Sequence, residues 1–210
     1  MTSSILKGYR EIMKKLLLIN GCVNLETSRT YRLCNELIKL LNKDNSYEIH
    51  ELILEKLNIQ PLTSETLNKR IKLMEKGELS DDSFKYANQF SEADCIVIAA
   101  PYWDCGFPGI LKIYIEAISV LGIVSMYEGD GQPTGLCKAE KLYYVTTRGG
   151  YVGDEKDLGF ATIKSLGYFF GIKNIMCIGA DGFDIVTNDF DAILQKAIEE
   201  LPAKLKRNVN

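Results

Sequence analysis

The sequence contains few of the residues that mark several large classes of protein. It has one histidine, and its six cysteines form no C-x-x-C pair. Scattered cysteines argue against a zinc or disulfide framework and favour free thiols in a reducing, cytoplasmic compartment. No apolar run approaches the roughly 20 residues of a membrane-spanning helix. We therefore expect a cytoplasmic protein with no membrane span and no metal site. The cysteines are Cys22, Cys34, Cys95, Cys105, Cys137 and Cys177.

An excess of positive charge is also missing. The chain has 25 basic and 28 acidic residues among 210, so it lacks the basic surface expected of a nucleic-acid-binding protein. Hydrophobic residues make up 46%, which is enough to bury a full core. We expect one domain over residues 13–210. Residues 1–12 form an extension without the apolar core of a signal peptide, and we assign it no role.

Short hydrophobic segments alternate with segments that have the spacing of amphipathic helices. The expected strands are residues 15–20, 46–54, 94–100, 141–147 and 174–179. The expected helices are residues 28–41, 61–77, 80–92, 108–121, 158–170 and 189–206. Ser80 is expected to cap the third helix, and Gly171 to close the fifth. The irregular segment 122–137 is expected to lie outside the core.

This alternation predicts an α/β fold in which a parallel sheet carries helices on both faces. Five strands fit the doubly wound order 2-1-3-4-5, which right-handed crossovers permit although periodicity does not reveal it. Ligands of such sheets bind beyond the carboxyl ends of the strands, where the strand order reverses. The loops 21–27, 101–107 and 148–157 should therefore meet between strands 1 and 3.

The first of these loops leads into the start of a helix. A helix N-terminus offers unpaired N–H groups and partial positive charge, and Thr27, Ser28 and Thr30 add hydroxyl groups. An ordinary Thr/Ser cap would use the same residues. The loop matches neither the G-x-G-x-x-G nor the P-loop pattern, so it predicts neither a dinucleotide site nor an NTPase. A site for a single phosphate remains open.

The second loop is rich in aromatic residues. Tyr102, Trp103 and Phe107 stand between Pro101 and Pro108. Aromatic side chains at the end of a strand either form the wall of a pocket for a planar ring or cap the core below. The sequence favours neither interpretation.

The third loop contains two adjacent glycines. Gly149 and Gly150 let the backbone approach a ligand and present N–H donors, while Arg148 is expected to stabilise negative charge. A Gly-rich turn with an exposed arginine would have the same sequence. The expected meeting of this loop with the other two favours a site.

Four segments of the chain carry a resemblance to one family. Residues 99–103 (AAPYW) and 106–112 (GFPGILK) are similar to its segment after strand 3 and the following helix. Residues 147–150 (TRGG) resemble its Ser-Arg-Gly-Gly loop, and Ser28-Arg29 the end of its phosphate-binding loop. The family is that of the flavodoxin-like NAD(P)H:quinone oxidoreductases and FMN-dependent NADH-azoreductases. The likeness extends over nearly the whole chain.

The resemblance implies a flavodoxin-like fold and an FMN site. In this family the first loop holds the FMN phosphate, the second lies along the isoalloxazine ring, and the Gly-Gly loop contacts its pyrimidine side. The residues so assigned to the cofactor are Gly21, Thr27, Ser28, Pro101, Tyr102, Trp103, Asp104, Cys105, Thr147, Arg148, Gly149 and Gly150.

Three positions depart from the family's pattern. Asn20-Gly21-Cys22 stands where the phosphate loop commonly opens with a serine. Glu26 replaces a hydroxyl residue, and its carboxylate would repel a phosphate unless it points outward. Asp104-Cys105 replaces Asn-Phe, and an aspartate accepts a hydrogen bond from the ring but cannot donate one as an amide does.

The implied activity is ping-pong transfer of hydride from NADH or NADPH through FMN to a quinone, azo or nitroaromatic acceptor. Gly149, Gly150 and Arg148 would stabilise negative charge on the reduced ring. Tyr151 is a candidate proton donor, whereas His50, on the second expected strand, is structural. The family forms homodimers with active sites at the interface, and we expect segment 123–137 near the partner.

Two alternatives belong to other functional classes. A flavodoxin-type electron carrier would have a strongly acidic docking face, and the near balance of charges argues against it. A regulatory member of the fold that has lost its flavin is the second alternative, and Glu26 is the feature in its favour.

Overall fold

The computed structural model describes residues 13–129 and 131–206, and its main sheet has five parallel strands. The expected extension at residues 1–12 lies outside this part. The order β2-β1-β3-β6-β7 confirms the predicted doubly wound order, because segment 122–137 adds two short strands to the numbering. The five strands are β1 (Lys14–Asn20), β2 (Tyr47–Ile53), β3 (Cys95–Ala99), β6 (Lys141–Arg148) and β7 (Asn174–Asp181).

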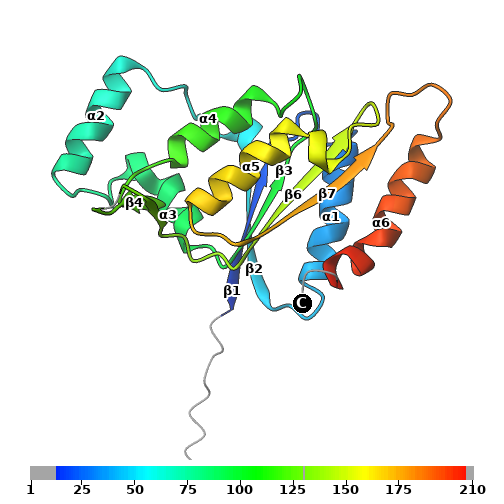
Figure 1. Cartoon of the computed structure of the whole chain (residues 1–210), viewed down its shortest axis with the longest axis horizontal. Helices are drawn as coiled ribbons and strands as arrows, with labels where there is room; N and C mark the ends of the chain where they lie inside the picture. Colours follow the sequence, from blue (N-terminus) through cyan, green and yellow to red (C-terminus); the bar gives the residue numbers. More distant parts are fainter. Residues whose placement is uncertain (1–12, 130, 207–210) are drawn as a thin grey trace, which may run out of the picture.

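Helices cover both faces of the sheet (Figure 1). One face packs against α1 (Arg29–Leu41) and α6 (Phe190–Lys206). The other packs against α3 (Lys85–Glu92), α4 (Gly109–Ile118) and α5 (Leu158–Phe169). Leu16 and Leu18 of β1 point to the first layer, and Leu17 and Ile19 to the second. Burial on both faces explains why residues 16–19 of this strand are continuously apolar.

The expected start of the third helix at Ser80 is wrong. The Asp81 carboxylate accepts a hydrogen bond from the Ser83 amide, and the Asp81 carbonyl accepts one from Phe84. These bonds form a 3₁₀ turn, η2 (Asp82–Phe84), so α3 begins only at Lys85. Asp81 rather than Ser80 therefore caps this region.

The second helix, α2 (Ser64–Glu75), lies outside the two main layers and has no fully buried residue. Thr63 and Thr66 form a capping box at its start. Arg70 ties it to α4 by donating to the carbonyl oxygens of Glu116 and Ser119. No helix in the described ranges is both long and apolar enough to cross a membrane.

Segment 122–137 is partly core, which corrects the expectation that it lies outside. Ile123 and Val124 are buried beside α3 and α4. They lead into a hairpin of β4 (Ser125–Tyr127) and β5 (Pro133–Gly135). The glycine that ends β5 lies directly against the backbone of Gly171, whose φ of 91° closes α5 as predicted. The sequence analysis overlooked that Ile123 and Val124 are adjacent apolar residues, which indicates burial even within an irregular segment.

The two outer strands of the sheet differ in how far other elements cover them from solvent. β2 is largely exposed and carries Glu48, His50 and Glu51, with His50 Nε2 3.2 Å from Glu48 Oε1. The predicted place of His50 on the second strand is confirmed. β7 lies beside α6, where Lys204 Nζ donates to the Gly179 carbonyl oxygen at 3.5 Å.

Candidate functional site

The three expected loops meet at the carboxyl ends of β1, β3 and β6. They surround a cleft of about 200 Å³. Eight of the twelve residues assigned to the cofactor line it, and these are Thr27, Ser28, Pro101, Tyr102, Trp103, Thr147, Arg148 and Gly149. The reversal of strand order thus places the loops together, as the topology rule requires.

The first loop presents the start of α1 to the cleft. Ser28 caps the helix, since its Oγ accepts a hydrogen bond from the Tyr31 amide at 3.1 Å. The amides of Thr27 and Ser28 both donate to the Asn24 carbonyl. Within the described residues, the amides of Arg29 and Thr30 have no hydrogen-bond acceptor, and both residues line the cleft. Free N–H groups at a helix N-terminus suit a phosphate.

Arg29 adds a positive charge that the sequence analysis did not assign to the site. Its guanidinium lies over the rings of Phe183 (5.4 Å) and Phe190 (4.8 Å). Its Nη1 is 3.9 Å from Asp184 Oδ1. Phe183 and Asp184 also line the cleft and come from the loop after β7. The sequence analysis could have included this loop, because it also follows the carboxyl end of a strand.

The second loop contains a tight turn from Trp103 to Gly106. The Gly106 amide donates to the Trp103 carbonyl at 2.7 Å, and Asp104 and Cys105 have φ values of 51° and 62°. Two consecutive positive φ angles match a type I′ turn, which usually contains Asn or Gly. Both side chains are exposed, and neither residue lines the cleft. The turn leaves Trp103, 48% exposed, at the cleft.

Direct hydrogen bonds join the loops to one another. The Tyr102 amide donates to the Thr147 carbonyl at 3.1 Å. Thr30 Oγ1 and Thr147 Oγ1 are 2.6 Å apart. Burial and a hydrogen bond with Cys105 raise the pKa of the Tyr102 phenol. The three segments therefore form one connected surface.

The side chain of Arg148 does not face the cleft, which corrects its expected role. Its guanidinium is buried on the other face of the sheet and pairs with Asp154, Asp157 and Asp181. Only the main chain of Arg148 is left to border the cleft, next to Gly149. The guanidinium therefore cannot stabilise negative charge on a ring bound there.

Five further residues considered in the sequence analysis do not line the cleft. Gly21 is buried below the cleft, and its amide donates to the Ala99 carbonyl at 2.8 Å. Glu26 is exposed and does not line the cleft, so the expected repulsion of a phosphate finds no support. Gly150 borders open space, and like Asp104 and Cys105 it is not part of the cleft wall.

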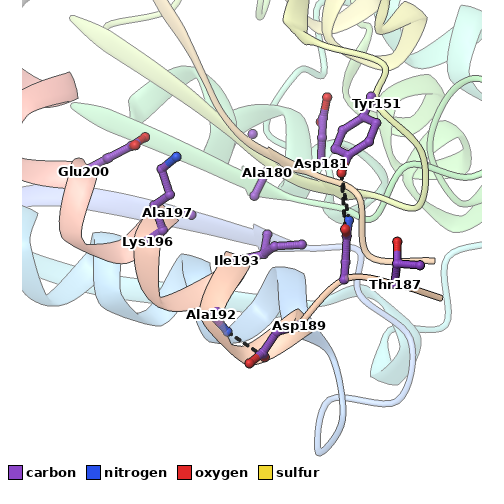
Figure 2. A pocket seen from close by; sticks show the side chains of 12 residues that line it. Tyr151, Ala180, Asp181, Thr187, Asp189, Ala192, Ile193, Lys196, Ala197 and Glu200 are labelled. Carbon is purple, nitrogen blue, oxygen red and sulfur yellow. Dashed lines mark hydrogen bonds between the residues drawn. The ribbon is translucent and has the colours of Figure 1, made fainter. Parts of the chain in front are cut away.

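Tyr151 lies in a different depression, a groove of about 480 Å³ between β7 and α6 (Figure 2). Its hydroxyl is 2.9 Å from Asn188 Nδ2, and its side chain is 72% exposed. Lys196 and Glu200 line the far part of this groove. The structure therefore does not bring Tyr151 into the cleft.

Differences in burial predict that one of the six thiols reacts much faster than the others. Cys105 is the exposed one. Burial raises the pKa of Cys22 to about 11 and the pKa values of Cys95 and Cys137 to about 12, and it raises those of Cys34 and Cys177 as well. Because the thiolate is the reactive form, a disulfide reagent at pH 8 should modify one thiol per native chain rapidly. Cys105→Ser should remove that phase, and a fast phase of two or more thiols would contradict the described burial.

Comparison with known proteins gives a consistent result. Residues 14–205 match a family described as having a flavodoxin-like fold. The chain is 33% identical to the "FMN-dependent NADH:quinone oxidoreductase" of Clostridium perfringens, over 93% of this chain and 100% of that protein. It is 36% identical to the protein of the same name from Clostridium beijerinckii, over 90% of this chain and 96% of the relative.

Solved structures agree in fold. An azoreductase from Bacillus anthracis superposes with a TM-score of 0.80 at 23% identity, covering 91% of this chain and 98% of its own. An FMN-dependent NADH-azoreductase from Bacillus anthracis, solved in complex with FMN, has a TM-score of 0.79 at 19% identity. It covers 94% of this chain and 100% of its own.

Proposed function

This chain belongs to the family with the flavodoxin-like fold, and we propose that it is an FMN-dependent NADH oxidoreductase that reduces quinone- or azo-type acceptors. The observation that carries the proposal is the identity of 33–36% to FMN-dependent NADH:quinone oxidoreductases over at least nine-tenths of the chain. The free amides at the α1 N-terminus support it, because they suit the single phosphate that distinguishes FMN from dinucleotides.

The described residues divide between the two ends of such a cofactor. The amides of Arg29 and Thr30, the Thr27 and Ser28 hydroxyls and the Arg29 guanidinium would hold the phosphate. The chemistry that bound FMN would supply is the transfer of hydride between NADH and the acceptor.

The remaining assigned residues belong to the ring end of the proposed site. The segment Pro101–Trp103 and the main chain of Thr147, Arg148 and Gly149 would orient the ring. Gly21 would support the ring site from below the cleft. Gly150 and the Asp104–Cys105 turn would contact the ring from the rim of the cleft. A proton-donating role for Tyr151 stays a prediction, and it requires the acceptor to reach the groove beside α6.

The proposal also covers assembly and location. We propose a single domain over residues 13–210 that works as a cytoplasmic homodimer. Exposed Met126 and Tyr127 on β4 support a partner contact there. Size-exclusion chromatography with light scattering tests the dimer, and Tyr127→Glu should shift it toward the monomer.

The first test is the visible absorption spectrum of the purified protein. We expect flavin bands that bleach when NADH is added without oxygen and return when a quinone follows. A flavin that binds but stays oxidised in NADH would indicate an electron carrier. A colourless protein that takes up no added FMN would indicate a flavin-free member of the fold.

A pair of arginine variants tests the assignment of the phosphate end. Arg29→Met should raise the Kd for FMN about tenfold, the equivalent of about 1.4 kcal/mol. Arg32→Met is the matched control, because Arg32 forms an exposed pair with Asp191 at 3.4 Å and does not line the cleft. Equal affinities of both variants and the wild type would refute this assignment.

A further inference from the structure

The side chain of Arg148 reaches away from the cleft that its main chain borders. Arg148 ends β6, and neighbouring residues of a strand point to opposite faces. Thr147 accordingly faces α1, where it meets Thr30, and Arg148 faces the side of α5. The arginine side chain is 1% exposed. A buried guanidinium needs a specific set of acceptors.

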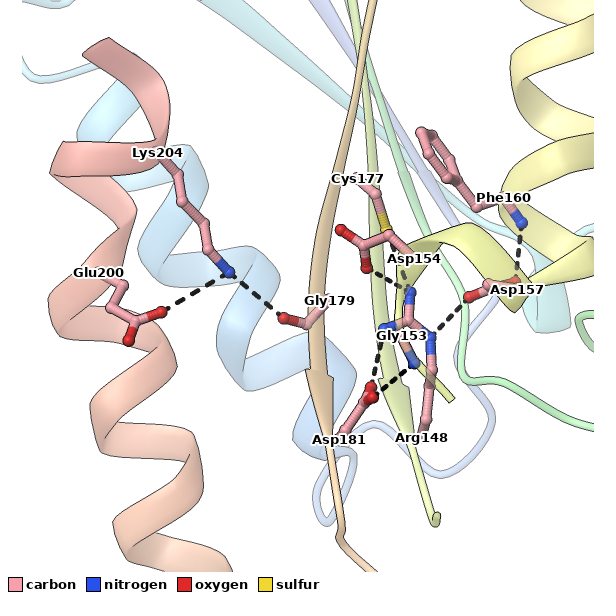
Figure 3. Close-up of polar contacts among 10 residues, drawn as sticks. All are labelled: Arg148, Gly153, Asp154, Asp157, Phe160, Cys177, Gly179, Asp181, Glu200 and Lys204. Carbon is pink, nitrogen blue, oxygen red and sulfur yellow. Dashed lines mark hydrogen bonds and ion pairs between the residues drawn. The ribbon is translucent and has the colours of Figure 1, made fainter. Parts of the chain in front are cut away.

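Three carboxylates from three different elements supply these acceptors (Figure 3). Nε donates to Asp157 Oδ2 at 2.8 Å, and Nη1 to Asp181 Oδ1 at 2.8 Å. Nη2 donates to Asp154 Oδ1 at 2.7 Å and lies 3.3 Å from Cys177 Sγ. Asp157 caps α5, Asp181 ends β7, and Asp154 begins the 3₁₀ turn η3 (Asp154–Lys156).

Two of the carboxylates are themselves held by backbone amides. Asp157 Oδ1 accepts from the Phe160 amide at 2.8 Å, and Asp181 Oδ2 accepts from the Gly153 amide at 2.7 Å. Burial alone would lower the pKa of Arg148, but its hydrogen bonds to Asp181 and Asp157 raise it above the usual value. The guanidinium therefore stays charged. Together with its aspartate partners it fixes both ends of the loop from Gly149 to Gly153.

The space for this guanidinium is built into β7. A Cβ atom on Gly179 would lie 2.5 Å from Nη1 of Arg148 and 2.7 Å from Asp154 Oδ1. A glycine at this position therefore admits the ion cluster.

The main chain connects the cluster to the cleft. The Arg148 carbonyl accepts hydrogen bonds from the Gly182 and Phe183 amides at 3.0 and 3.1 Å. The Gly149 carbonyl accepts one from the Asp184 amide at 2.9 Å. Arg148, whose side chain is held by the three carboxylates, is therefore also the residue at which the loop with Gly149 and Gly150 begins.

We propose that Arg148 is a positioning residue which, through Asp154, Asp157 and Asp181, holds the Gly149–Gly150 backbone in the form that receives the flavin ring. This inference rests on the proposed function, since it concerns the ring end of the FMN site. Its physical basis is preorganisation: a loop already fixed in its binding conformation loses less entropy when a ligand binds. Arg148 acts without touching the cofactor.

Comparing two flavins tests this role. Arg148→Lys keeps the charge but loses the planar fork that three carboxylates share. We expect the Kd values for FMN and for riboflavin, which lacks the phosphate, to rise by the same factor of about ten. Arg29→Met should instead weaken FMN alone. Titrations would follow quenching of flavin fluorescence, together with the visible circular dichroism of the bound flavin.

Matched variants keep the result interpretable. Arg32→Lys makes the same exchange in an exposed ion pair and should change neither Kd. Asp154→Asn alters the carboxylate that is 47% exposed, so this variant should fold and show a smaller rise in both Kd values. If Arg148→Lys does not fold, Asp154→Asn decides by the same criterion.

The outcomes separate the two proposals. Equal loss for both flavins with an altered dichroism band, in variants shown by urea titration to be fully folded, supports the positioning role. A purely stabilising role would leave the affinity of folded protein unchanged, and that result, or a loss confined to FMN, overturns the inference. A wild-type chain that binds neither flavin would instead refute the proposed function itself.

Discussion

Arg148→Met should lower the free energy of unfolding of the flavin-free protein by about 3–5 kcal/mol, the usual cost of removing one partner from a buried ion cluster. The variant leaves Asp157 fully buried and Asp181 22% exposed, both without their cation. Methionine fills much of the volume of arginine, so the loss should come from uncompensated charge and not from a cavity. Urea unfolding at neutral pH measures it, with an unchanged m-value confirming a comparable transition.

A second substitution tests the cause of that loss. Adding Asp157→Asn to Arg148→Met removes the most deeply buried of the unpaired charges, and the amide oxygen can still cap α5. The double variant should therefore be more stable than Arg148→Met alone. If Arg148→Met costs less than about 1 kcal/mol, the cluster contributes no more than an exposed ion pair.

Gly135→Ala should lower the free energy of unfolding by about 3 kcal/mol, at the upper end of the range for overpacking. A Cβ atom at this position would overlap the backbone nitrogen of Gly171 and the carbonyl carbon of Phe170. Neither obstacle is a side chain that could rotate away. The β4–β5 hairpin would have to separate from the end of α5, which would disturb the bond from the Cys137 amide to the Phe170 carbonyl.

Gly109→Ala is the matched control for this substitution. Gly109 is the first residue of α4, has no positive φ, and a Cβ atom there would meet no atom within 4 Å. Alanine favours helix over glycine by up to about 1 kcal/mol, so the control should be neutral or slightly stabilising. Equal midpoints in urea for Gly135→Ala and the wild type would show that the hairpin does not pack as described.

Most of the fold could be predicted from the sequence because the central strands β1, β3 and β6 are buried on both faces. In a chain of this composition, largely apolar runs such as residues 15–20 and 94–100 indicate buried strands. Their alternation with helices then indicates a parallel sheet. The failures lie where local chemistry outweighs periodicity. The Asp81 side chain forms a turn ahead of α3, and Val124 is buried within an otherwise irregular segment.

The location of the cleft could be predicted as well, because it depends only on strand order. The residues missed there come from long-range packing. Arg29 enters the site through its contacts with Phe183 and Phe190, about 150 residues away in the chain. No local pattern announces such a contact. The loop after β7 could have been included by the same rule that selected the other three.

The misplacement of Arg148 has a precise geometric origin. The expected strand ended at residue 147, whereas β6 includes Arg148. Because Arg148 is the last extended residue of β6, its side chain points to one face of the sheet. Side chains alternate between the two faces along a strand, so the Arg148 side chain points away from the face that carries Thr147. Aspartates at 154, 157 and 181 were visible in the sequence. That they converge on one guanidinium depends on the pairing of β6 with β7.

The charged, exposed strand β2 has a consequence for behaviour at high concentration. Its outer edge offers backbone N–H and C=O groups that could pair with a strand of another molecule. Glu48 and Glu51 place negative charge along this rim, so two such edges approaching each other would repel. Protonating these carboxylates, or exchanging both for threonine, should therefore promote edge-to-edge pairing between the sheets of different molecules.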